Sequence, residues 1–274
     1  MATNIYPTLR EIRDTHAWKR DYERYLPLSR YVFRPLGFLL TWLAIRIGLT
    51  SEAVSWLSGF IGLIAYLCLI SSQEYLLLVG IALLCFFNIL DCVDGSIART
   101  MKTENPYGRF LDSLMNWVDM GFWALIGIVV YRHEQLVYFS GPIEYSPVFW
   151  LAAGGVTSYF FILLGYIEST FDQYVRDEWK GIGAKNDTDL KNKTKDKKTS
   201  HSFHREIPPF SVVRIIGHNI KVRETHYFLL ILAYLCKAID LLLVFYLFYY
   251  FLNTIFLIII YSNRGRQLLK SYNA

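Results

Sequence analysis

Long hydrophobic runs, separated by short polar breaks, occupy most of the chain. Four of them cover residues 53–70, 75–90, 111–131 and 148–167. A helix needs about 20 mostly apolar residues to cross the hydrocarbon core of a bilayer. Residues 226–261 are long enough for two more helices, and we place their break near Lys237 and Asp240, since charges are costly at bilayer depth. The pattern predicts an all-α membrane protein with six transmembrane helices, the fifth beginning before His226, near Lys221.

A seventh apolar stretch, residues 31–48, is interrupted by Arg34 and Arg46. With six spans, the two termini share one side with segment 171–223, which carries twelve Lys and Arg, while Arg132 and Lys237 lie on the other side. The positive-inside rule assigns the basic side to the cytoplasm. A crossing by residues 31–48 would move the basic N-terminal segment to the opposite side. We therefore predict that this stretch is an interfacial amphipathic helix, with both termini and the site in the cytoplasm.

The predicted organisation is a single membrane domain over residues 1–274. It comprises an N-terminal segment with the interfacial helix (1–50), a six-helix bundle (51–262) with a basic cytoplasmic loop (171–223), and a tail (263–274). Within the loop, the Lys-rich stretch 180–202 is interpreted as a solvated linker. The first thirty residues lack the apolar region of a signal peptide.

Composition agrees with a membrane protein, because 54% of the residues are hydrophobic and 19% are charged, with a net charge of +5. A typical soluble domain has about 25% charged residues. This composition excludes a disordered chain, a fibrous protein and a secreted disulfide scaffold. The four cysteines are far apart and are expected to be free thiols: Cys68, Cys85, Cys92 and Cys236.

Aspartates gather near the ends of the predicted spans, where each would cost roughly 2.5–3.5 kcal/mol at the bilayer centre. Asp91 and Asp94 are three residues apart and share a helix face, and Asp112 and Asn116 are four apart and share another. If these two helices are antiparallel neighbours, three carboxylates converge at the mouth of the bundle.

Converging carboxylates repel one another unless a cation neutralises them. Mg²⁺ favours one or two carboxylates together with substrate phosphates, and no His or Cys stands at the spacing that zinc requires. Gly95 and Ala98 leave room for a ligand near the backbone, and Arg99 can bind phosphate through a charge-assisted fork. The residues alone therefore indicate a metal-dependent phosphate site and phosphoryl transfer.

The same residues resemble the signature of the CDP-alcohol phosphotransferases, D-x-x-D-G-x-x-A-R, eight residues, G, three residues, D, three residues, D. Seven of the eight fixed positions match at the right spacing: Asp91, Asp94, Gly95, Ala98, Arg99, Gly108 and Asp112. Residues 50–55 (TSEAVS) resemble the segment that opens the first span in many members, although its Pro and Asn are missing.

This resemblance implies transfer of a substituted phosphate from a CDP-linked alcohol to an acceptor hydroxyl, with release of CMP, in phospholipid or related lipid synthesis. It implies that two Mg²⁺ or Mn²⁺ ions bind to Asp91, Asp94 and Asp112. The CDP part would be held by Gly95, Ala98, Arg99 and Gly108. One substrate would be a lipid, no nucleic acid is expected as a partner, and a homodimer is an assembly common in the family.

Asn116 departs from the signature, because it stands where the family has the last Asp, the expected general base. General-base help is typically worth about 10²–10⁴-fold in rate. Three explanations remain open: an engineered inactive variant, a natural member that uses Asp112 or recruits Asp119 as the base, or a chain that no longer catalyses. The plainer interpretation of Asp119 is a polar residue bonded to a neighbouring helix.

Two other function classes compete. A non-catalytic CDP-lipid-binding protein of the same fold is the alternative that Asn116 supports. A transporter is disfavoured, because the acids cluster at one end of the spans and no inverted repeat is visible. The particular alcohol and acceptor stay open; Arg214 or Arg223 could bind a phosphate on the acceptor, although both also fit as cytoplasmic anchors.

Overall fold

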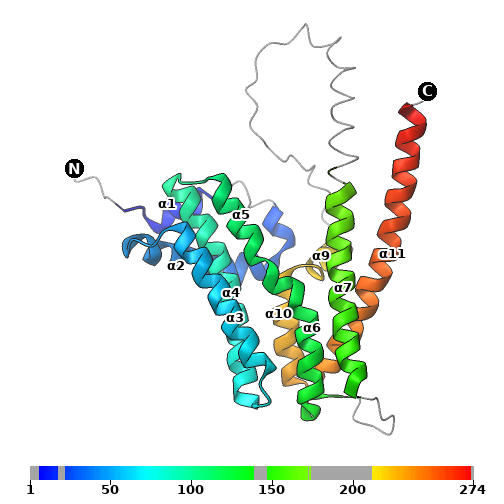
Figure 1. Cartoon of the computed structure of the whole chain (residues 1–274). Helices are drawn as coiled ribbons and strands as arrows, with labels where there is room; N and C mark the ends of the chain where they lie inside the picture. The colour runs from blue at the N-terminus through cyan, green and yellow to red at the C-terminus, as the bar shows by residue number, and fades with distance from the viewer. Residues whose placement is uncertain (1–5, 18–21, 139–146, 172, 174–211, 273–274) are drawn as a thin grey trace, which may run out of the picture.

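A computed structural model describes residues 6–17, 22–138, 147–171, 173 and 212–272, and these residues form helices without a strand (Figure 1). Five helical stretches are long and apolar enough to cross a membrane. They are Ser51–Ile70 (α3), Glu74–Met101 (α4), Pro106–Arg132 (α5 and α6 together), Val148–Phe171 in α7 and Ile239–Gln267 in α11. The predicted all-α membrane fold is thus confirmed for five spans. The Lys-rich stretch 180–202 lies outside the described residues.

The fifth predicted span corresponds to a shorter helix, α10 (Arg223–Leu235), which has 13 residues. At 1.5 Å per residue it is about 20 Å long, less than the hydrocarbon core of a bilayer. As predicted, it begins before His226 and is separated from α11 (Ile239–Tyr272) by a break around Lys237, whose φ of 53° lies in the left-handed region. A short helix, α9 (Val212–Asn219), precedes it.

The N-terminal segment forms α1 (Leu9–Asp14), a short 3₁₀ helix (η2, Tyr22–Tyr25), a short π-helix (η3, Ser29–Phe33) and α2 (Arg34–Arg46). A helix therefore occupies most of the predicted stretch 31–48. The buried side of α2 includes Gly37, Thr41, Ala44 and Ile45, and the helix packs against α4. Its other side exposes leucines: Leu36, Leu39 and Leu43.

Close packing of neighbouring helices builds the bundle. α3 and α4 are joined by a short turn and pack along each other. α6 crosses α7 (Pro147–Phe171) where Gly127 faces Gly154, and a Cβ on Gly127 would lie 2.9 Å from the Cα atom of Gly154. Small residues at such a crossing allow two membrane helices to approach closely. A buried aromatic cluster around Trp123, Tyr246 and Tyr250 connects these helices to α11.

The predicted span at residues 111–131 is divided into two helices. α5 covers Pro106–Met115 and α6 covers Trp117–Arg132, with Asn116 between them. A 3₁₀ turn, η4 (Glu134–Leu136), follows α6. In Figure 1 the C-terminal ends of α4, α7 and α11 and the start of α5 lie towards the same end of the bundle. The signature residues at the end of α4 and the start of α5 therefore lie at one end of the bundle and not at its middle.

Candidate active site

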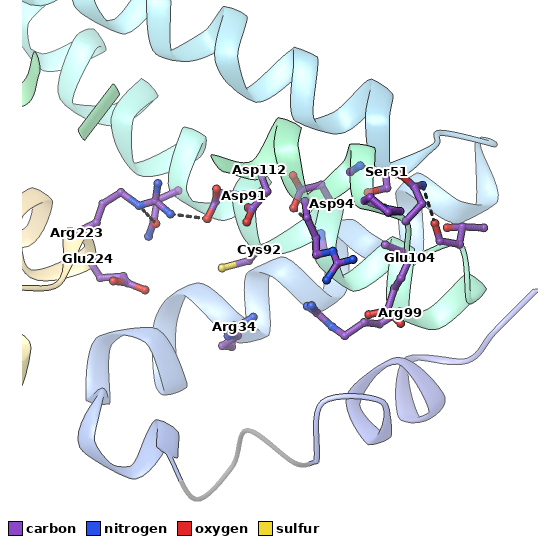
Figure 2. A pocket seen from close by; sticks show the side chains of 18 residues that line it. Arg34, Ser51, Asp91, Cys92, Asp94, Arg99, Glu104, Asp112, Arg223 and Glu224 are labelled. Carbon is purple, nitrogen blue, oxygen red and sulfur yellow. Dashed lines mark hydrogen bonds and ion pairs between the residues drawn. The ribbon is translucent and has the colours of Figure 1, made fainter. Parts of the chain in front are cut away.

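A cavity of about 610 Å³ opens where the last turns of α4 meet the start of α5, with α10 and α2 beside it (Figure 2). Its lining includes seven residues of the sequence signature: Asp91, Asp94, Gly95, Ala98, Arg99, Gly108 and Asp112. The eighth position, Asn116, is half-buried at the junction of α5 and α6 and is not part of this lining. The fold thus gathers in one cavity residues that the sequence spreads over two helices.

The turn between α4 and α5 folds the two halves of the signature towards each other. Lys102 ends α4 in the left-handed region, with φ of 56°, and the Thr103 amide donates to the Ala98 carbonyl at 2.9 Å, as in a typical helix C-cap. Asn105 begins α5 by accepting from the Gly108 amide at 2.8 Å, and Pro106 occupies the first turn. These caps place Gly108 and Asp112 on the cavity.

Asp94 is the most buried of the three aspartates, with 4% of its surface exposed. The Ser55 hydroxyl, from α3, donates to Asp94 Oδ2 at 2.6 Å, and the Gly95 amide donates to Oδ1. The carboxylate is therefore oriented by hydrogen bonds from two helices. Ser55 belongs to the segment 50–55 noted in the sequence, but its role could not be inferred there, because its partner lies 39 positions away.

Asp91 is bonded to Arg223, the first residue of α10. The same guanidinium donates to Asn88 Oδ1 at 2.9 Å and to Asp119 Oδ2 at 3.3 Å, and the Tyr227 hydroxyl donates to the other Asp119 oxygen at 3.3 Å. Asp119 is thus bonded to a neighbouring helix, which agrees with the plainer of its two interpretations. Arg223, considered from sequence as a ligand for a phosphate on the acceptor, pairs with Asp91 in the cavity lining and with Asp119 outside it.

Arg99 is held by a residue that sequence reasoning missed. Its Nη2 and Nε donate to Nε2 of His16, at 2.7 and 3.2 Å. A Cβ on Gly95 would lie 3.1 Å from both terminal nitrogens of Arg99, so the guanidinium passes close over the backbone at that glycine. The signature residues Gly95 and Arg99 are therefore in contact with each other.

The cavity is lined by charges of both signs, with four further charged residues beside the aspartates, Arg99 and Arg223: Arg34, Glu104, Arg109 and Glu224. Figure 2 shows the three aspartates in the middle, with Arg223 to one side and Arg99 to the other. Within the described residues, no three His, Cys, Asp or Glu side chains are grouped closely enough to form a ready-made metal site. The donors that line the cavity are carboxylate oxygens, which is the ligand type that Mg²⁺ combines with substrate phosphates. This donor set fits a divalent cation that binds together with a diphosphate.

Comparison with known proteins agrees with this geometry. The family model described as CDP-alcohol phosphatidyltransferase matches residues 49–195, more than half of the chain, and the match contains α3 to α7 and the aspartates of the cavity. No curated protein matches the chain significantly. Family enzymes of this kind are typically metal-dependent. On the strength of this match and of the signature residues that line one cavity, the chain belongs to the CDP-alcohol phosphatidyltransferase family.

Proposed function

We propose that this chain transfers a substituted phosphate from a CDP-linked alcohol to the hydroxyl of an acceptor and releases CMP. The observation that carries the proposal is the cavity itself, whose lining includes Asp91, Asp94 and Asp112 as well as Arg99. Carboxylates can hold cations and a guanidinium can bind phosphate, and both serve phosphoryl transfer, where positioning and electrostatics supply most of the catalysis.

In this proposal Asp91, Asp94 and Asp112 hold two divalent cations, Mg²⁺ or Mn²⁺, whose chemistry when bound is to neutralise the charge of the diphosphate. Arg99 donates to the phosphates, while Gly95, Ala98 and Gly108 keep space at the backbone for the CDP part. The acceptor oxygen forms a bond to the β-phosphorus of the donor. The bond from that phosphorus to the bridging oxygen breaks, and CMP leaves with the electron pair.

The acceptor proton needs a base, and Asn116 has no carboxylate to receive it. Asp112 is exposed and lines the cavity, whereas Asp119 is not among the residues that line it. We therefore favour Asp112 as the group that receives the proton in this chain. A base that also holds a cation is a weaker base, so we expect slow turnover.

We further propose that α10 completes six passes, that α2 lies in the membrane interface and that the cavity faces the cytoplasm. The exposed leucines of α2 support the interfacial position, because they would face acyl chains. A cavity at one end of the bundle lets a lipid enter from the bilayer and a water-soluble substrate enter from the cytoplasm.

The test measures CMP release by the full chain in detergent or nanodiscs, with Mn²⁺ or Mg²⁺ and with panels of CDP-alcohols and acceptor alcohols. We expect slow, divalent-dependent release by the chain, and faster release, by up to about 10²–10⁴-fold, by the Asn116→Asp variant. Asp112→Ala should release none. If the variant and the chain release CMP at the same rate, position 116 is not the site of the base.

A non-catalytic CDP-lipid-binding protein is the second candidate, and Asn116 is the observation that favours it. CMP release separates the two functions, because both predict divalent-dependent binding of CDP and only the enzyme releases CMP. If the chain and Asn116→Asp both bind CDP but neither releases CMP with any donor and acceptor pair, the transferase proposal is wrong for this chain.

A further inference from the structure

His16 comes from the N-terminal segment, yet its imidazole ring lies against a side chain of the candidate active site. It is separated from Arg99 by 83 positions and is 2% exposed. Its ring packs edge-on against Phe38 of α2, with centroids 5.1 Å apart. The family match begins at residue 49, so this contact is made by a part of the chain that the match does not include.

The hydrogen bonds around His16 define its role in the contact. A guanidinium can only donate, so Nε2 of His16, at 2.7 Å from Arg99 Nη2, must accept. The ring proton is then on Nδ1, which lies 3.2 Å from the Ile12 carbonyl oxygen in α1 and can donate to it. Ser96 Oγ also lies 3.2 Å from Nε2, but its hydroxyl donates to the Cys92 carbonyl oxygen at 2.6 Å. A neutral imidazole, fixed by the backbone of α1, thus presents its acceptor nitrogen to Arg99.

The guanidinium of Arg99 is confined on two sides. Gly95 permits its close approach to the backbone of α4, where a Cβ would lie 3.1 Å from the terminal nitrogens. His16 accepts from Nη2 and Nε. An Arg side chain loses considerable rotamer freedom when it is fixed, so a guanidinium that is already oriented binds a phosphate with a smaller entropic cost.

We propose that His16 is a positioning residue, which orients Arg99 for the diphosphate of the CDP-linked donor and so makes the N-terminal segment part of the donor site. This inference rests on the proposed function and extends it. The imidazole acts through Arg99 and takes no part in bond formation. Its removal should therefore weaken donor binding and raise KM, while kcat changes little.

The experiment compares two substitutions of His16. Phe keeps a ring to pack against Phe38 but has no acceptor, whereas Gln carries an amide oxygen that can accept from Arg99. Binding of CDP in the presence of Mn²⁺ is measured by calorimetry on the full chain in detergent. We expect His16→Phe to raise the Kd for CDP roughly 10-fold, because the loss of about one hydrogen bond corresponds to a change of that size. His16→Gln should retain most of the affinity.

Two controls separate positioning from a merely structural role. His133 is also buried, but its ring nitrogen lies 3.0 Å from the Ser71 carbonyl oxygen, at the end of α3 away from the cavity. His133→Phe should therefore leave the Kd for CDP unchanged, whatever its effect on stability. In an Arg99→Gln background, His16→Phe should have no further effect on the Kd, because the group that His16 positions is gone.

The outcomes distinguish this inference from the proposed function. If the unmodified chain binds CDP and His16→Phe binds it equally well, the positioning role is wrong and the proposed function stands. An equal loss of affinity from His16→Phe with and without Arg99 would also overturn it. If the unmodified chain binds neither CDP nor CDP-alcohols, the proposed function fails, and the positioning role fails with it.

Discussion

The guanidinium group of Arg223 donates a hydrogen bond to the carboxylate of Asp91, although 132 positions separate the two residues. The arginine begins α10, and the aspartate lies on α4 within the signature that the family match contains. An internal cation thus neutralises a carboxylate that we assign to a divalent cation. Arg223 and the divalent cation would therefore compete for Asp91.

Replacing Arg223 with Gln should make the cation-free chain less stable and its affinity for Mn²⁺ higher. Asp91 and Asp119 would lose the charge that holds them together, and breaking a buried ion pair costs roughly 3–5 kcal/mol. Both carboxylates keep some exposure, 17% and 22%, so we expect the low end of that range. Unfolding in detergent with and without Mn²⁺ measures both effects. Lys221→Gln is the control and should change neither quantity much, because the ion pair of Lys221 with Glu168, at 3.9 Å, is exposed. Weaker Mn²⁺ binding by Arg223→Gln would contradict the competition for Asp91.

Removing either of two cavity carboxylates, by Asp91→Ala or Asp112→Ala, should abolish divalent-dependent binding of CDP. The two side chains line the cavity from different helices, and each would supply charge that the cation and the diphosphate require together. Calorimetry with CDP and Mn²⁺ checks this. Glu134→Ala is a matched control, since Glu134 is an exposed carboxylate at the far end of α6. Unchanged binding in either aspartate variant would remove that residue from the metal assignment.

Ser55→Ala should weaken Mn²⁺ binding while leaving the helices intact. Its hydroxyl donates to Asp94 Oδ2 at 2.6 Å and fixes the direction of that carboxylate. Loss of a residue that orients a metal ligand typically costs about 10–100-fold in metal affinity. Ser58→Ala is the control one turn away: Ser58 is equally buried, but its hydroxyl donates only to the Ser55 carbonyl of its own helix, at 2.7 Å. Equal Mn²⁺ affinities in the two variants would show that Ser55 does not orient a ligand.

The spans could be predicted from hydrophobic runs, but the ends of the helices could not. The apolar run ends at Leu90, whereas α4 continues to Met101, so that Asp91 and Asp94 lie on a helix as their spacing predicts. The motif residues Asp91 and Asp94 end the apolar pattern, while the backbone stays helical until Lys102 adopts a left-handed conformation. Conversely, no Gly or Pro marks the division of α5 from α6 at Asn116. Hydropathy therefore located the membrane segments and misplaced the boundaries that shape the site.

The candidate site was predictable where local spacing carries the chemistry. The spacing of the signature identified residues that line the cavity, from Asp91 to Asp112. The side chains that orient them were not predictable in this way, because His16, Ser55 and Arg223 reach their partners from other segments of the chain, across long stretches of sequence. Such contacts depend on the packing of α1, α3 and α10 around α4, and helical periodicity contains no information about that packing.

The crossing of α6 and α7 gives a test of the fold that is independent of the chemistry. A Cβ on Gly154 would lie 2.7 Å from the Trp123 carbonyl oxygen and 2.8 Å from the Cα atom of Gly127, so Gly154→Ala must push two backbones apart. Overpacking of this kind costs typically about 1–3 kcal/mol. Gly155 is the neighbouring residue on the same helix, and nothing lies within 4 Å of a Cβ built there. Gly155→Ala should therefore leave the thermal stability in detergent unchanged or slightly raised, while Gly154→Ala lowers it. Equal stabilities would mean that the two helices do not meet at these glycines.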